Sequence, residues 1–292
     1  MLNKNDLNEL NIKAKGYKKN KNTVLLETSN NEKYIFKNKE QDLDKKFKYL
    51  TTRSFNYFPN YTSTTNYNVF EYIEDYDIPK EEKAKDIINL ISILHLKTTH
   101  YKKVDVDEYK KIYEEMTDKI EDLKKYFLNL NTKVEEEIYM SPSHYLLIRN
   151  ISKIYSNLEY CKNSLDKWYE KIKEKENKRV VFIHNNLELS HYFKNEKEYL
   201  ISWDKSKFDS PVYDLYNFYK NNYRDIDFNI LLNQYEQRYP LTEEEILFLF
   251  LLISLPDKIN FINDDYKNTI EVDNLLNYIY KTDKIILEYN AN

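Results

Sequence analysis

A polar loop in the second half of the chain carries the side chains best suited to chemistry. It starts at His184, directly after an apolar run, and includes Asn186 and His191. A second apolar run leads into Ser202, and Asp204 follows two residues later. Imidazole, amide, hydroxyl and carboxylate groups can together hold a polar ligand, transfer a proton or bind a cation. Strand alternation would place the side chains of Ser202 and Asp204 on the same face.

Two interpretations of the loop histidines stay open on the residues alone. His184 either packs its ring on the loop backbone or binds a metal ion together with His191. A zinc site needs three or four protein ligands, and we expect no neighbouring carboxylate or cysteine to complete such a set. Cys161 is the only cysteine, which excludes an intrachain disulfide. Its polar surroundings contain nothing that would activate a thiolate, so neither a metal centre nor a cysteine nucleophile is predicted.

Length and charge restrict the class of protein further. The chain has 292 residues, enough for one large domain or two lobes. Its net charge is -4 and its lysines alternate with acids, which argues against a nucleic-acid partner. The N-terminus lacks an apolar signal core, and the most apolar run, residues 246–253, is too short to span a bilayer. We therefore predict a cytoplasmic protein without a membrane span.

The first third of the chain is predicted to be mostly β-structure. Two apolar runs, residues 24–28 and 33–37, flank a turn-rich segment and predict a hairpin. A helix is expected around Phe47, and residues 68–73 predict a further strand. We expect residues 1–75 to form a small lobe that contains an antiparallel sheet and one helix.

The remainder, residues 76–292, is predicted to be a larger, mainly helical lobe. Apolar residues at positions 87, 90, 91 and 94 have the spacing of one buried helix face, and His95 and Trp203 are expected in the core. Two long Lys- and Glu-rich helices are expected on either side of Pro142. Further elements follow in the order strand (179–183), short hairpin (192–201) and helices beyond Pro211. The fold class is therefore α+β.

The order of these motifs resembles the aminoglycoside phosphotransferase and choline kinase family. Its members carry a His-x-Asp-Leu-x-x-x-Asn loop after an apolar strand, then Ile-Asp-Trp/Phe-Asp/Glu, then Tyr-Asp-Leu at a helix start. This chain has His-Asn-Asn-Leu-Glu-Leu-Ser-His from His184, Ile-Ser-Trp-Asp from Ile201, and Tyr-Asp-Leu from Tyr213. The resemblance covers the chain from about Gly16 to about Asn222 and is greatest to the spore-coat kinase-like branch of spore-forming bacteria.

The resemblance implies a two-lobed, protein-kinase-like fold with a helical hairpin inserted in the larger lobe, and ATP with Mg²⁺ as cofactors. It implies that Lys37 contacts the phosphates of ATP and that Phe70 to Glu74 form the hinge between the lobes, with Glu71 and Ile73 at the cofactor. Asp214 is implied to be a structural residue that hydrogen-bonds back to the loop at His184. Gly16 is the only glycine, whereas phosphate-cradling loops normally contain several. Lys18, Lys19 and Lys21 beside it could attract phosphates electrostatically.

The acidic partner of Lys37 is expected in the helix that follows it. Glu40, Asp42 and Asp44 are all candidates, and the sequence does not choose among them.

Three positions depart from the pattern of the family. Asn186 occupies the place of the aspartate that accepts the proton of the attacking hydroxyl. His191 replaces the asparagine that holds one Mg²⁺, and Ser202 replaces the aspartate that bridges metal and phosphates. An amide is no general base at neutral pH, and imidazole or hydroxyl groups are poorer Mg²⁺ ligands than carboxylates. The combined changes predict lost phosphoryl transfer.

Three hypotheses about function follow. The favoured one is a pseudokinase that acts by binding or scaffolding, with a small molecule in the interlobe cleft or a protein partner, for example in a spore coat. The alternative is an active ATP-dependent small-molecule phosphotransferase in which Asp204 takes over as a metal ligand. The third is a structural protein whose cleft is filled by aromatic side chains, since the chain contains 29 tyrosines.

Overall fold

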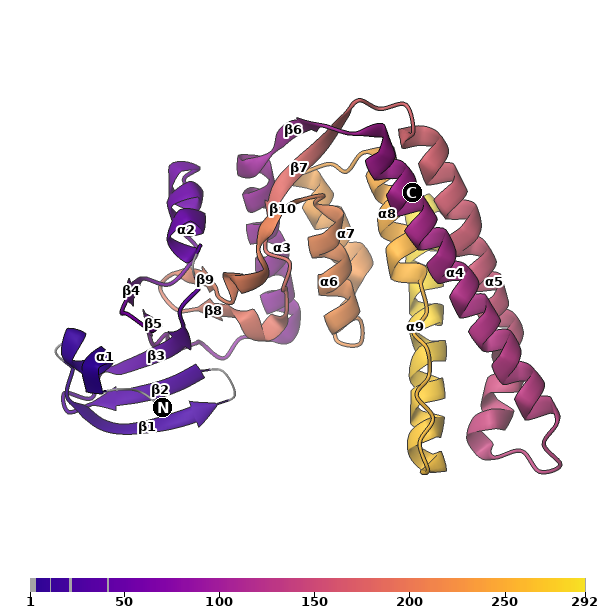
Figure 1. The fold of residues 1–292 in the computed structure, drawn as a ribbon, viewed down its shortest axis with the longest axis horizontal. Helices are drawn as coiled ribbons and strands as arrows, with labels where there is room; N and C mark the ends of the chain where they lie inside the picture. Colours follow the sequence, from indigo (N-terminus) through magenta and orange to yellow (C-terminus); the bar gives the residue numbers. More distant parts are fainter. Residues whose placement is uncertain (1–3, 11, 21–22, 41, 292) are drawn as a thin grey trace.

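The protein folds into two lobes, as its computed structural model shows (Figure 1). The structure describes residues 4–10, 12–20, 23–40 and 42–291. A small sheet with two helices forms the N-terminal lobe, and a larger, mostly helical lobe follows it. The α+β class and the two-lobed, kinase-like arrangement predicted from the sequence are confirmed.

The N-terminal lobe is built on a five-stranded antiparallel sheet with the strand order β1-β2-β3-β5-β4. Alternate residues of its central strands bury Leu26, Phe36 and Val69 in a small core. The lobe holds two helices among its described residues, so the prediction of one helix was wrong: the short α1 was missed. Its elements are α1 (Lys4–Glu9), β1 (Ala14–Asn20), β2 (Thr23–Thr28), β3 (Lys33–Asn38), α2 (Leu43–Thr52), β4 (Tyr61–Ser63) and β5 (Tyr67–Glu71).

One large core fills the C-terminal lobe and extends to α2 and Phe55 of the N-terminal lobe, and each α-helix of the C-terminal lobe contributes to it. Its helices are α3 (Lys80–Thr98), α4 (Val106–Glu135), α5 (Pro142–Ile172), α6 (Val212–Asn222), α7 (Phe228–Arg238), α8 (Glu243–Ser254) and α9 (Asp265–Ala291), with the 3-10 turns η1 (Leu189–His191) and η2 (Trp203–Lys205). Its strands are β6 (His100–Lys103), β7 (Asn177–Ile183), β8 (Tyr192–Lys194), β9 (Glu198–Leu200) and β10 (Lys207–Asp209). Among the described residues, no helix combines the length and the apolar character that crossing a bilayer requires.

The long helices α4 and α5 form the predicted hairpin, and α5 packs on α8 and α9 (Figure 1). Pro142 occupies the first turn of α5, where its missing N–H costs no hydrogen bond, and the Ser141 side chain accepts from the His144 N–H. The expected stripe on α3 is buried, from Ile87 through Leu94.

Strand β7 leads from this helical region toward the cleft between the lobes. It is the central strand of the three-stranded sheet β10-β7-β6, and it ends at Ile183, directly before the polar loop. The two-stranded sheet of β8 and β9 follows the loop and carries the chain to Ser202. The polar loop at His184 and the segment from Ser202 to Asp204 therefore follow neighbouring strands of the same lobe.

Candidate functional site: the interlobe cleft and its polar loop

The carboxylate of Asp214, at the start of α6, holds the polar loop in place. Its Oδ2 accepts the backbone N–H of His184 at 2.8 Å, and its Oδ1 accepts that of Asn185 at 2.6 Å. The ring Nε2 of His95 on α3 donates to Oδ2 at 3.1 Å. All these contacts lie in the interior, where Asp214 and His95 are fully buried. Asp214 thus makes the bonds to the loop that the resemblance implied.

His95 also contacts a third helix, α7. Its Nδ1 lies 2.7 Å from the hydroxyl of Tyr235 on α7. Burial keeps the pKa of Tyr235 well above its ordinary value, so the hydroxyl is protonated and donates to Nδ1. The chain Tyr235–His95–Asp214 therefore connects α7, α3 and α6 to the loop. His95 is a core residue, as expected, and Tyr235 was not predicted as part of the site.

His184 is fully buried and neutral. Its Nε2 donates to the carbonyl of Ile201 at 2.8 Å, which ties the loop to the second segment. Its Nδ1 is buried without a hydrogen-bond partner among the described residues. The ring packs edge-on against Trp203 at 4.6 Å. Burial lowers the pKa of His184 to about 4, with nearby Asp214 acting in the opposite direction.

Asn186 and His191 contact each other at the mouth of the loop. Nδ1 of His191 donates to the backbone carbonyl of Asn186 at 2.7 Å, while the rings of His191 and His184 are 6.4 Å apart. Nowhere in the described ranges do three His, Cys, Asp or Glu side chains converge as metal ligands do. A divalent cation here would have to complete its coordination with phosphate oxygens and water.

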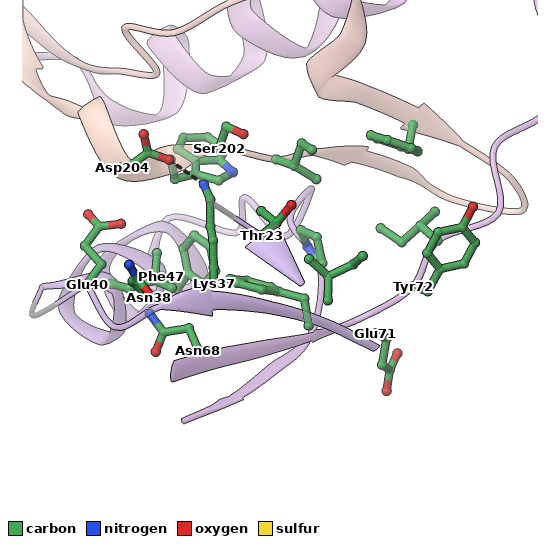
Figure 2. Close-up of a pocket in the computed structure, with 18 of the residues that line it drawn as sticks. Thr23, Lys37, Asn38, Glu40, Phe47, Asn68, Glu71, Tyr72, Ser202 and Asp204 are labelled. Atoms are coloured by element: carbon green, nitrogen blue, oxygen red, sulfur yellow. Dashed lines mark hydrogen bonds and ion pairs between the residues drawn. The ribbon is translucent and has the colours of Figure 1, made fainter. Parts of the chain in front are cut away.

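Lys37 and Asp204 form an ion pair across the cleft. The ammonium rises from β3 toward the C-terminal lobe, and its Nζ lies 2.7 Å from Asp204 Oδ1 (Figure 2). Partial burial acts to raise the pKa of Asp204, but the hydrogen bond and charge of Lys37 outweigh it and lower the pKa. The carboxylate is therefore ionised at neutral pH. Asp204 belongs to the turn η2. Ser202 directly precedes this turn and has a φ of 66°, a left-handed conformation that is strained for serine.

The expectation that Lys37 pairs with an acid of the next helix is wrong. Glu40 pairs with Lys46, Asp42 with Lys45, and Asp44 accepts from the hydroxyl of Tyr61. The acid that reaches Lys37 comes instead from the other lobe, 167 positions along the chain.

Lys46 on α2 makes a second connection between the lobes that the sequence did not indicate. Its Nζ donates to Glu40 Oε1 at 2.5 Å and to the carbonyls of Trp203 and Asp204 at 3.1 Å each. A lysine ammonium has three N–H donors, so Lys46 has used all of them. Lys37 and Lys46, both from the smaller lobe, thus bind the same turn, η2.

A cavity of about 340 Å³ lies between the lobes at this point (Figure 2). Its walls include Lys37, Glu71, Ile73, Ser202 and Asp204 of the predicted site. Apolar side chains from both lobes line it as well: Ile35, Leu43, Phe47, Phe70, Phe193, Ile201 and Trp203. Aromatic side chains border this space without filling it, which contradicts the hypothesis of a collapsed cleft.

The predicted hinge forms one end of the cavity. The N–H of Tyr72 is bonded to the carbonyl of Lys33 at 3.1 Å, whereas that of Ile73 has no partner in the described part of the chain. The carboxylate of Glu71 points away from the cavity (Figure 2). The Ile73 N–H is therefore available to an acceptor atom of a ligand. His184, Asn186 and His191 do not belong to the cavity wall that the described residues form.

The wall of the cavity is mostly apolar. Ile35 of the N-terminal lobe and Ile201 of the C-terminal lobe both belong to it, as does Ile73 at the hinge end. At the other end Lys37 is the one cation among the described residues of the wall, and it is already paired. Lys18 and Lys19 lie on the exposed strand β1, and Lys21 lies outside the described residues.

Cys161, which the sequence singled out, is structural, and so are four aromatic side chains of α6. Cys161 is buried, and burial raises its pKa to about 12, so it is an unreactive thiol. In the aromatic stripe of α6, Phe218 and Tyr219 belong to the core, while Tyr213 and Tyr216 are half-buried and pack against it.

The arrangement of lobes, loop and cleft is the fold of kinase-like phosphotransferases. It is similar to the aminoglycoside phosphotransferase of Alicyclobacillus acidocaldarius, with a TM-score of 0.76 and 10% identity over 100% of this chain and 96% of that one. It is also similar to spectinomycin phosphotransferase, with a TM-score of 0.54 and 12% identity over 95% and 90% of the two chains. At such low identities the likeness establishes the fold alone. No protein-family model matches the chain, and no curated protein sequence is similar to it.

Proposed function

We propose that the protein is a pseudokinase, which binds a small molecule in the interlobe cleft and does not transfer phosphoryl groups. The amide of Asn186 is the observation that carries this proposal. The loop around it keeps an intact frame, because Asp214 holds the backbone of His184 and Asn185. Within that frame a neutral amide occupies the place of the general base, and it has no means of accepting the proton of an attacking hydroxyl.

The cleft supports the binding part of the proposal. Its volume of about 340 Å³ is within the range of roughly 300–1,000 Å³ typical of small-molecule sites. Its walls are largely apolar, with the Ile73 N–H and a few polar side chains to orient a ligand. Spectinomycin phosphotransferase, which shares the fold, has been solved with bound AMP. Adenine nucleotides are therefore the first ligands to test.

Two measurements test the proposal together. Thermal shift with and without Mg²⁺ measures nucleotide binding, and phosphoryl transfer from ATP is measured on a panel of metabolites that carry hydroxyl or amino groups. We expect ligand-dependent stabilisation without turnover. Robust turnover that Lys37→Ala abolishes would refute the pseudokinase. Lys284→Ala, at an exposed position of α9, is the matched control and should behave like the unmodified protein.

A scaffolding role in a spore coat is part of the same proposal, and it is supported only by the sequence resemblance. The hairpin of α4 and α5 offers a long surface rich in Lys and Glu for a protein partner. Immunodetection of the protein in coat extracts of the producing organism would test this setting. Recovery in the cytoplasmic fraction alone would contradict it.

A second candidate function is favoured by the position of Asp204. Its carboxylate is ionised and lies 2.7 Å from Lys37. It could therefore hold a cation beside bound phosphates, the role that the family assigns to an aspartate at the position of Ser202. An active phosphotransferase of this kind predicts Mg²⁺-dependent nucleotide binding that Asp204→Ala abolishes. Mg²⁺-dependent binding that survives Asp204→Ala would count against it.

A further inference from the structure

We propose that the cleft selects an uncharged heterocycle of nucleoside size and discriminates against its polyphosphate forms when no divalent cation is present. This inference rests on the proposed function, because it takes the cleft to be a small-molecule site. It concerns the part of the cavity wall that Lys37, Glu40 and Asp204 line, together with Lys46, which is bonded to Glu40 and to the carbonyl of Asp204 behind them. We call these four side chains the charged end of the cleft.

The positive charge of Lys37 is compensated before any ligand arrives. Asp204 is ionised and lies at 2.7 Å, and the side chains of the pair are 32% and 44% exposed. Water reaches both side chains, so the pair compensates the charge of Lys37 locally while solvent still screens it. Lys37 has further N–H groups to offer a phosphate, but no uncompensated charge.

Lys46 has neither charge nor donors to spare. Its charge is compensated by Glu40, and its remaining N–H groups are bound to the carbonyls of Trp203 and Asp204. A phosphate could recruit it only by breaking bonds that hold the two lobes together. Lys39 is also occupied, because its Nζ donates to the carbonyl of Thr64 at 2.8 Å.

The charged end therefore contains two ammonium groups and two carboxylates. No surplus of positive charge remains among the described residues of the cavity wall. A polyphosphate that leaves water needs such a surplus to offset its lost hydration, and it would also approach Glu40 and Asp204. Each phosphate added to a metal-free ligand thus brings desolvation and like-charge repulsion.

The rest of the cavity suits the uncharged part of such a ligand. Ile35, Phe193 and Ile201 offer apolar faces to a flat ring, and the free Ile73 N–H can donate to a ring nitrogen. Asn38 also lines the cavity, and its side-chain amide has no hydrogen-bond partner in the described part of the chain, so it offers neutral groups to hydroxyls of a sugar. The volume of about 340 Å³ stands near the lower limit for ligand sites, which also fits a nucleoside better than a nucleoside triphosphate.

Calorimetric titration with adenosine, AMP, ADP and ATP in EDTA tests the inference. We expect adenosine to bind at least as tightly as ATP, with affinity level or falling as phosphates are added. Asp204→Asn frees the charge of Lys37 and should shift the ratio of ATP to adenosine affinity toward ATP by on the order of tenfold. Lys37→Gln should shift the ratio the other way, and it serves as the second variant if Asp204→Asn does not fold. Lys284→Gln, at an exposed position of α9, should leave the ratio unchanged.

The outcomes separate this inference from the proposed function. Metal-free ATP that binds more than tenfold tighter than adenosine would overturn the selectivity and leave the binding function standing. Equal ratios in the unmodified protein, Asp204→Asn and Lys37→Gln would also overturn it. Absence of binding by every ligand of the series would overturn both the selectivity and the cleft as an adenine site. Phosphoryl transfer, measured separately with Mg²⁺, decides whether the protein is a pseudokinase.

Discussion

Changing Asp214 to asparagine should lower the free energy of unfolding by about 3 kcal/mol. The carboxylate accepts three N–H groups, from His184 and His95 on Oδ2 and from Asn185 on Oδ1. An amide oxygen can occupy only one of these two positions. In the better orientation it keeps two bonds, and its own NH₂ group then faces the N–H of Asn185. One lost bond to a charged acceptor and one buried, unpaired donor contribute about 1.5 kcal/mol each.

Urea titration followed by tryptophan fluorescence measures this change. Trp203 packs against His184 and reports on the loop, and a Trp168→Phe background makes it the only tryptophan. The melting temperature should fall by roughly 6–12 °C. Asp225→Asn is the control, because it makes the same chemical change in an exposed ion pair with Lys80, for which we expect about 1 kcal/mol or less. Equal effects of the two variants would refute the anchoring role of Asp214.

Three further predictions follow from burial and bonding. Burial lowers the pKa of His184 to about 4, so between pH 6.5 and pH 4 the unfolded chain binds more protons than the folded one. The free energy of unfolding should therefore decrease by on the order of 3 kcal/mol as the pH is lowered through that window. Urea titrations across the window should show a weaker pH dependence in His184→Gln. Lys46→Met leaves Glu40 and two carbonyls without their ammonium and should cost about 2 kcal/mol in thermal unfolding, whereas a cost near zero would mean that water replaces it. Cys161, whose pKa burial raises to about 12, should resist a disulfide reagent at pH 8 until the chain unfolds, and rapid labelling of the native protein would contradict its burial.

The parts of the fold that could be predicted are those in which a segment stabilises itself through its own pattern. The stripe on α3 and the hairpin of β2 and β3 have periodicities that their own residues reveal. Strand β6 was missed because its sequence, His-Tyr-Lys-Lys, is exposed along its whole length. It is a strand because its backbone pairs with β7, and its side chains do not indicate this pairing.

The site divides along the same line. The bonds of Asp214 to the loop at His184 could be predicted because both residues stand in short motifs with fixed spacing. The partner of Lys37 could not, because local sequence favours the nearest acids and the tertiary structure brings in Asp204 from 167 positions away. The bonds of Lys46 to the carbonyls of η2 also join residues that are far apart in the sequence. Every residue has a backbone carbonyl, so the sequence cannot indicate which one accepts a bond.

The hydrogen bonds that hold the frame of the site do not depend on the side chains of Asn186, His191 and Ser202. The loop is held by the Asp214 carboxylate, and the turn η2 is held by Lys37 and Lys46 of the other lobe. The side chains at the three substituted positions carry none of these bonds; of the three, only His191 makes a side-chain hydrogen bond in the described structure, and that bond stays within the loop. Substitution at these positions therefore removes no hydrogen bond between the lobes. In the pseudokinase proposed above, selection for binding alone would preserve Asp214, Lys37 and Lys46 while leaving positions 186, 191 and 202 free to change.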